Sequence, residues 1–94
     1  MDLIIYQNEA YLLGDEIKKR FRQKYKHFNV RVYYHIENEI LKGIDIEIIE
    51  PLLHLRRSRM ISVNGFFKVS DFIEYIIITA SDLVEEILKS YYTI

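Results

Sequence analysis

The residues best suited to chemistry in this sequence are positively charged and clustered. Seven of the thirteen Lys and Arg residues fall between Ile17 and Ile36 with no acidic residue among them: Lys18, Lys19, Arg20, Arg22, Lys24, Lys26 and Arg31. Arg56, Arg57 and Arg59 form a second cluster. A surface of one sign attracts partners of the opposite sign and speeds their approach. The chemistry that these clusters offer is the binding of phosphate or carboxylate groups.

Eight of these cations form the predicted site for an anionic partner: Lys18, Lys19, Arg22, Lys26, Arg31, Arg56, Arg57 and Arg59. On a helix that buries an apolar stripe, the first four lie on the opposite arc. Arginine's planar guanidinium also binds phosphate or carboxylate better than lysine does. The alternative is solubilising charge, with helical ion pairs in the first cluster and an exposed turn between strands in the second.

Polar residues in the middle of the chain raise the question of a metal site. His35, Glu37, Asp45 and Glu47 share one face of a predicted hairpin, in which His35 lies opposite Asp45 and Tyr33 opposite Glu47. Mixed His and carboxylate ligands can hold a divalent cation. A half-exposed sheet needs such alternating polar residues in any case. We therefore predict no metal site.

Catalytic motifs are lacking in the sequence. The chain has no Cys, its serines lie in no G-x-S-x-G context, and its three isolated glycines form no phosphate-binding loop. We therefore expect neither an enzyme nor a cofactor.

The first half of the chain predicts one helix and one firm hairpin. Residues 3–6 and 10–13 are apolar runs around a polar turn, which favours a hairpin, with a helix starting at Asn8 as the alternative. Gly14 favours the hairpin, because glycine marks a boundary better than a helix interior. Asp15 then begins a helix over 15–28. Residues 30–37 and 44–48 alternate with their even-numbered residues inward, so they predict an antiparallel hairpin.

The second half is less regular. Glu50-Pro51 ends the sheet strand, 52–57 predicts a short helical turn, and Asn64-Gly65 predicts a hairpin between 59–63 and 66–69. Residues 72–79 favour a buried strand, with a helix beginning at Ser70 left open as the alternative. A last helix starts after Thr79 or Ser81.

These elements predict an α+β fold in which an antiparallel sheet carries an early basic helix and a C-terminal helix on one face. The order of elements loosely resembles that of double-stranded RNA-binding domains. Those domains have lysines at the start of the last helix, whereas the helix predicted here begins Ser81-Asp82-Leu83-Val84-Glu85-Glu86, which would repel phosphate. We therefore assign the chain to no family.

Length and composition limit the function classes. Ninety-four residues, half of them apolar, predict a single small globular domain over 1–94. The absence of Cys and of a long apolar run fits a cytoplasmic protein. Abundant Ile and Tyr suggest an AT-rich genome, such as that of a low-GC bacterium, an archaeon or one of their viruses.

The leading hypothesis for function is a non-enzymatic interaction protein, such as a phage or mobile-element accessory or inhibitor that binds a host macromolecule through charged surfaces. It would act in the host cytoplasm, and the acid-rich segments 37–50 and 82–86 would mimic nucleic acid. The alternative is a nucleic-acid-binding module that uses the 18–31 block and Arg56, Arg57 and Arg59. The net charge of −1 favours the first. We also predict a homodimer, because sheet edges and the apolar C-terminal residues Tyr91, Tyr92 and Ile94 need cover.

Overall fold

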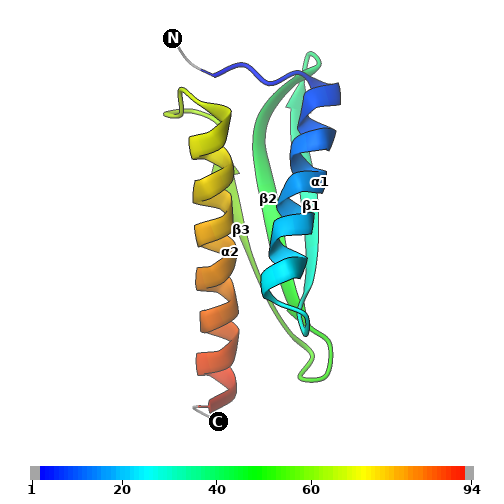
Figure 1. Ribbon diagram of the computed structural model, residues 1–94, viewed down its shortest axis with the longest axis vertical. Coiled ribbons are helices and arrows are strands. Elements are labelled where there is room, and N and C mark those ends of the chain that lie inside the picture. The colour runs from blue at the N-terminus through cyan, green and yellow to red at the C-terminus, as the bar shows by residue number, and fades with distance from the viewer. Residues whose placement is uncertain (1–2, 93–94) are drawn as a thin grey trace.

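The computed structural model describes residues 3–92, which form two helices on one face of a three-stranded antiparallel sheet (Figure 1). In chain order the elements are α1 (Gln7–Lys24), β1 (Asn29–Glu37), β2 (Ile40–Glu50), β3 (Leu55–Ser62) and α2 (Val69–Tyr92). This arrangement confirms the predicted α+β class with both helices on the same side of the sheet. Along its principal axes the molecule measures 45 by 21 by 21 Å, so it is long and narrow.

The sheet has the order β1-β2-β3, and its inward face matches the predicted parity. Val30, Val32 and Tyr34 of β1 pair with Ile48, Ile46 and Ile44 of β2. The register is shifted by two residues from the prediction, because the turn is shorter than expected. Only Asn38 and Glu39 form it, both with positive φ angles of 51° and 66°, as a tight hairpin requires.

The predicted N-terminal hairpin is wrong, and the alternative helix is present. α1 runs from Gln7 to Lys24, so Gly14 lies inside it and is no boundary. A Cβ atom at Gly14 would overlap the Tyr34 hydroxyl oxygen. Glycine therefore leaves room for the Tyr34 side chain where α1 approaches β1. The helix ends before the predicted residue 28, because Tyr25 adopts an extended conformation.

The prediction for the second half is also corrected in its local detail. Residues 59–62 belong to β3, which pairs with β2, and the turn at Asn64 and Gly65 leads into a helix instead of a second strand. Residues 51–54 form a turn, and β3 replaces the expected helical segment after it. Residues 72–79 are helical, as the alternative proposed. They belong to one helix of 24 residues, so the helix start predicted at Thr79 or Ser81 is wrong.

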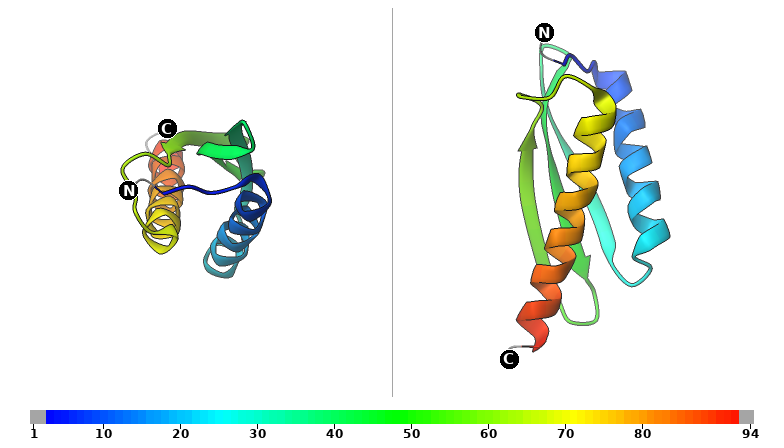
Figure 2. Two further views of the ribbon diagram at one scale, coloured as in Figure 1. Left: turned by 90° about the horizontal axis from the view of Figure 1, so that it is seen from above. Right: turned by 60° about the vertical axis from the view of Figure 1, so that its left-hand side comes forward.

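The core lies between the sheet and the helices. α1 contributes Ala10, Leu13, Ile17 and Phe21, α2 contributes Phe72, Ile76, Ala80, Leu83 and Ile87, and β2 contributes Ile44, Ile46 and Ile48. Both helical sets repeat at three or four residues, so each helix turns one apolar stripe toward the sheet. Seen from above in Figure 2, both helices lie below the sheet, whose other face is uncovered.

Candidate anion-binding surface

The two basic clusters come together at one end of the molecule. Across the sheet, Asn29 of β1 pairs with Ile49 of β2, and Ile49 pairs with Arg56 of β3. This row lies where β1 and β3 begin and β2 ends. The short connection 25–28 joins the C-terminal end of α1 to β1 in the same region. The C-terminal end of α2 also lies there (Figure 1). We call the cations gathered here the basic end: Arg22, Lys24, Lys26, Arg31, Arg56 and Arg57.

Most cations of the basic end are not neutralised by acidic side chains. Within residues 3–92, none of Arg22, Lys24, Lys26 and Arg31 forms an ion pair, and all four are exposed. Arg31 lies opposite Glu47 in the strand register. The Arg56 side chain is 72% exposed, and its guanidinium lies 3.8 Å from the Glu47 carboxylate, a distance too long for a strong pair. These charges are therefore available to an anionic partner.

Three of the predicted residues lie outside this group, and two of them are paired elsewhere. Lys18 forms an ion pair with Asp15 at 3.4 Å, and Arg59 forms one with Glu86 at 3.0 Å. Lys19 is exposed on α1, about one turn before Arg22, and has no acidic partner among the described residues. The sequence-based selection also left out Lys24, whose ammonium lies 5.3 Å from the centre of the Tyr25 ring.

The second arginine cluster lies on a strand, not at the predicted turn. Because side chains alternate along β3, Arg56 points to the uncovered face of the sheet, whereas Arg57 and Arg59 are on the side of the helices. Arg57 donates a hydrogen bond of 2.7 Å to the Ser90 hydroxyl of α2. This bond holds the C-terminal end of α2 against the start of β3, so the basic end is assembled from four elements.

Acidic residues gather at the opposite end of the long axis. They lie at the start of α1, at the end of β1 and in the turn after it, and in the first turn of α2, namely Glu9, Glu37, Glu39 and Asp71. Glu74, further along α2, instead pairs with Arg20 of α1 at 3.3 Å. Backbone hydrogen bonds join these segments, from the Gln7 amide to the Glu39 carbonyl and from the Leu3 amide to the Phe66 carbonyl. Charge is thus unevenly distributed along the molecule, with Lys42 and Lys68 near the acidic end and Glu47 and Glu50 near the basic end, although the net charge is only −1.

The polar face of the hairpin differs from the predicted arrangement. His35 lies opposite Gly43, and Asp45 lies opposite Tyr33. In the described part of the chain no three His, Asp or Glu residues are close enough to hold a metal ion. Glu47 lies on the uncovered face with its carboxylate largely buried, and one of its oxygens has no hydrogen-bond partner.

The comparisons with known proteins identify no relative. No protein-family model matches the chain, and neither the curated proteins nor the solved structures gave a match. The difference from double-stranded RNA-binding domains rests on other residues than predicted: Lys68 before α2 is followed by Asp71 and Glu74, not by a lysine cluster. None of the described helices is both long and apolar enough to cross a membrane.

Proposed function

We propose that this chain is a non-enzymatic binding protein that engages the phosphate backbone of a nucleic acid through its basic end. The observation that carries the proposal is the convergence of two cation clusters, distant in sequence, on one end of the fold. Phosphates that contact these side chains release condensed counterions, which drives binding without any need for base recognition. The local concentration of charge supports this function more than the net charge opposes it.

Exposed aromatic rings near these cations favour a single strand over a duplex. Tyr33 lies two residues beyond Arg31 on the same uncovered face of the sheet and is 47% exposed. Tyr91 and Tyr92 are exposed at the end of α2. Unpaired bases stack on such rings while cations hold the backbone. Tyr25 is not available for stacking, because its ring packs between those of Phe21 and Phe28.

The rival function, an inhibitor that mimics nucleic acid with its acidic segments, has less support. Glu50 is only 7% exposed, the Glu47 carboxylate is largely buried, and Glu86 is paired with Arg59. The acids of 37–50 and 82–86 therefore do not present one continuous negative surface. The experiment must therefore distinguish a nucleic acid from an acidic protein as the partner of the basic end.

The test measures the affinity for a labelled single-stranded oligonucleotide by fluorescence anisotropy at several salt concentrations. With four phosphate contacts, the logarithm of the affinity should fall with the logarithm of salt concentration with a slope of about −3. Arg22→Glu combined with Lys26→Glu should weaken binding at least about tenfold. Lys42→Glu combined with Lys68→Glu makes the same change in charge at the acidic end and should have a much smaller effect.

Three results would contradict the proposal. Equal losses of affinity in the two double variants would mean that only net charge matters. An affinity that does not change with salt concentration would show that phosphate contacts do not contribute to binding. If the oligonucleotide fails to bind while polyglutamate binds and is released by the Arg22 and Lys26 reversals, the partner of this end is an acidic polypeptide.

A further inference from the structure

The outer edge of β3 is open to another strand. Among the described residues only β2 pairs with β3, and the register from Leu55 to Ser62 is unbroken. The other edge strand, β1, has an irregularity between His35 and Ile36. Bulges disturb the hydrogen-bonding geometry of an edge and hinder the addition of a strand. β3 is therefore the better template of the two.

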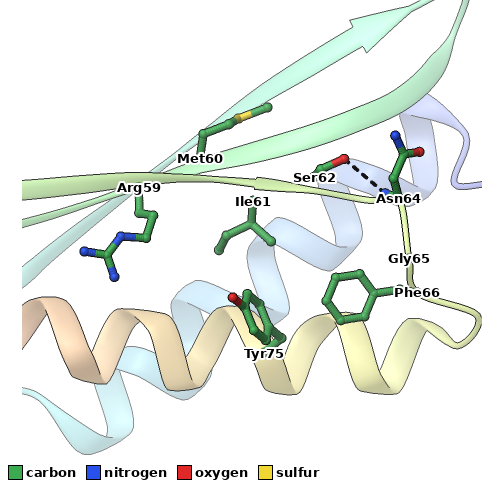
Figure 3. A pocket seen from close by; sticks show the side chains of 8 residues that line it. All are labelled: Arg59, Met60, Ile61, Ser62, Asn64, Gly65, Phe66 and Tyr75. Carbon is green, nitrogen blue, oxygen red and sulfur yellow. Dashed lines mark hydrogen bonds between the residues drawn. The ribbon is translucent and has the colours of Figure 1, made fainter.

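A groove runs beside this edge, between β3 and α2 (Figure 3). Its volume is about 400 Å³. Ile61 of β3 and Tyr75 of α2 point into the space between the two elements, and Phe66 lies at one end, whereas Met60 points away from it. The Tyr75 ring is 51% exposed and its centre lies 5.4 Å from that of Phe66. The groove thus offers an apolar and aromatic pocket next to a strand edge that has no strand partner among the described residues, although the Arg57 guanidinium donates a hydrogen bond of 2.8 Å to the Arg56 carbonyl.

The end of the groove near Phe66 is held in place by backbone contacts. The Val63 amide donates to the Lys42 carbonyl at 3.0 Å, and the Asn64 amide donates to the Ser62 hydroxyl at 3.1 Å. Gly65 completes the turn with a φ of 92°, which favours glycine. Phe66 also packs against the buried Phe72, with 5.2 Å between ring centres. A wall that is already ordered lowers the entropy cost of binding.

The charge of β3 selects among possible occupants. The strand contains three arginines and no acidic residue. Two copies of β3 paired edge to edge would bring these like charges together, which costs free energy. The strand that β3 already accepts, β2, has Asp45 and Glu47 on the uncovered face and isoleucines toward the helices. An acidic strand of the same alternation suits the free edge.

We propose that the free edge of β3 binds an extended acidic segment of another protein, which adds to the sheet as a fourth strand. An apolar side chain of this segment fills the pocket between Ile61, Phe66 and Tyr75. Five residues along the segment, about 17 Å away in an extended strand, the side chain points to the uncovered face, where a carboxylate meets Arg56. Main-chain hydrogen bonds supply affinity and the alternating side chains supply specificity, as in other complexes formed by strand addition.

The probe for this site is a blocked synthetic peptide as long as β3, in which aspartate alternates with valine and the valine placed opposite Ile61 is phenylalanine. Binding is followed by amide NMR shifts of the whole protein. We expect the shifts to concentrate on residues 55–62 and 75. Tyr75→Ala should weaken binding about tenfold, because it removes a pocket wall. Tyr33→Ala, an equally exposed tyrosine on the other face, should leave binding unchanged.

Further controls separate this site from the basic end. The same peptide with asparagine in place of aspartate should bind at least about tenfold more weakly. Arg22→Glu with Lys26→Glu should leave peptide binding intact while it weakens nucleic-acid binding. Shifts that map to residues 22–31, equal affinity for the asparagine peptide, or no binding would each overturn the proposal. So would shifts in 55–62 that grow with protein concentration alone, because they would assign this edge to a second copy.

Discussion

Gly14 lies in the interior of α1, where glycine costs about 1 kcal/mol of helix stability relative to alanine. Its advantage is the space that it leaves for Tyr34, whose hydroxyl would overlap a Cβ atom. The Tyr34 ring packs edge-on against Tyr11 with 5.1 Å between ring centres, so a shift that relieves this overlap would disturb that contact. Local propensity and tertiary packing therefore oppose each other at this residue.

Gly14→Ala tests which effect is larger. Overpacking costs about 1–3 kcal/mol, more than the gain in helix propensity, so we expect a net loss of about 1 kcal/mol in the free energy of unfolding. In a Tyr34→Ala background the same substitution should be stabilising, because only the propensity term remains. Urea unfolding of the wild type, the two single variants and the double variant gives the double-mutant cycle. The same effect of Gly14→Ala in both backgrounds would show that Tyr34 is not the reason for the glycine.

Tyr34 also makes stability depend on alkaline pH. Burial raises the pKa of its phenol above 10.0, and the charges of Asp15 and Tyr11 raise it further. The unfolded chain therefore ionises this group first. Its contribution to stability is complete below about pH 10 and is lost as pH rises through the higher pKa of the folded state. Tyr34→Phe should lose less stability than the wild type between pH 7 and about pH 11.

Tyr33→Phe is the matched control for this measurement, because Tyr33 is the neighbouring residue and is exposed. It should show the wild-type loss of urea-unfolding free energy over the same pH range. If the two variants respond to pH alike, the alkaline loss comes from other groups and not from the phenol of Tyr34.

α2 shows what a local reading of the sequence can and cannot predict. Residues 72–79 are rich in Ile and aromatic residues, a composition that favours strands. Buried positions at 72, 76, 80, 83 and 87 nevertheless continue one helical stripe through the whole element. Burial against the sheet decides between the two, and burial depends on tertiary structure. The fold class and the central hairpin were predictable because their periodicities are strong. Gly14 and Asn64-Gly65 instead favoured two hairpins that the structure does not contain.

The candidate surface was predictable in its residues but not in its assembly. Cations without intervening acids are visible in the sequence, so Arg22, Lys26 and Arg31 were identified. Their proximity to Arg56 depends on the row from Asn29 to Arg56 across three strands. The row forms because the hairpin turn has only two residues, and the register predicted from the sequence assumed a longer turn. The pairing of Arg59 with Glu86 likewise required the position of α2.

The whole molecule is elongated, with an excess of cations at one end and an excess of acidic side chains at the other. Its length of 45 Å exceeds the Debye length of about 8 Å at physiological ionic strength several times. Each end therefore attracts its own partner with little influence from the other. This separation also gives two copies a favourable arrangement, side by side and antiparallel, in which each basic end lies next to the partner's acidic end.

We expect such a two-fold dimer at low salt, held chiefly by charge. At about 1 M salt the Debye length falls to about 3 Å, so the dimer should dissociate. Light scattering over a dilution series at both ionic strengths measures this. Arg22→Glu with Lys26→Glu should abolish the dimer, whereas Tyr92→Ala, a change at an exposed ring, should preserve it. The mass of one chain at every concentration in low salt would refute the dimer. A dimer that survives 1 M salt would instead place the contact on the strand edges or the C-terminal tyrosines, the features other than charge that predict self-association.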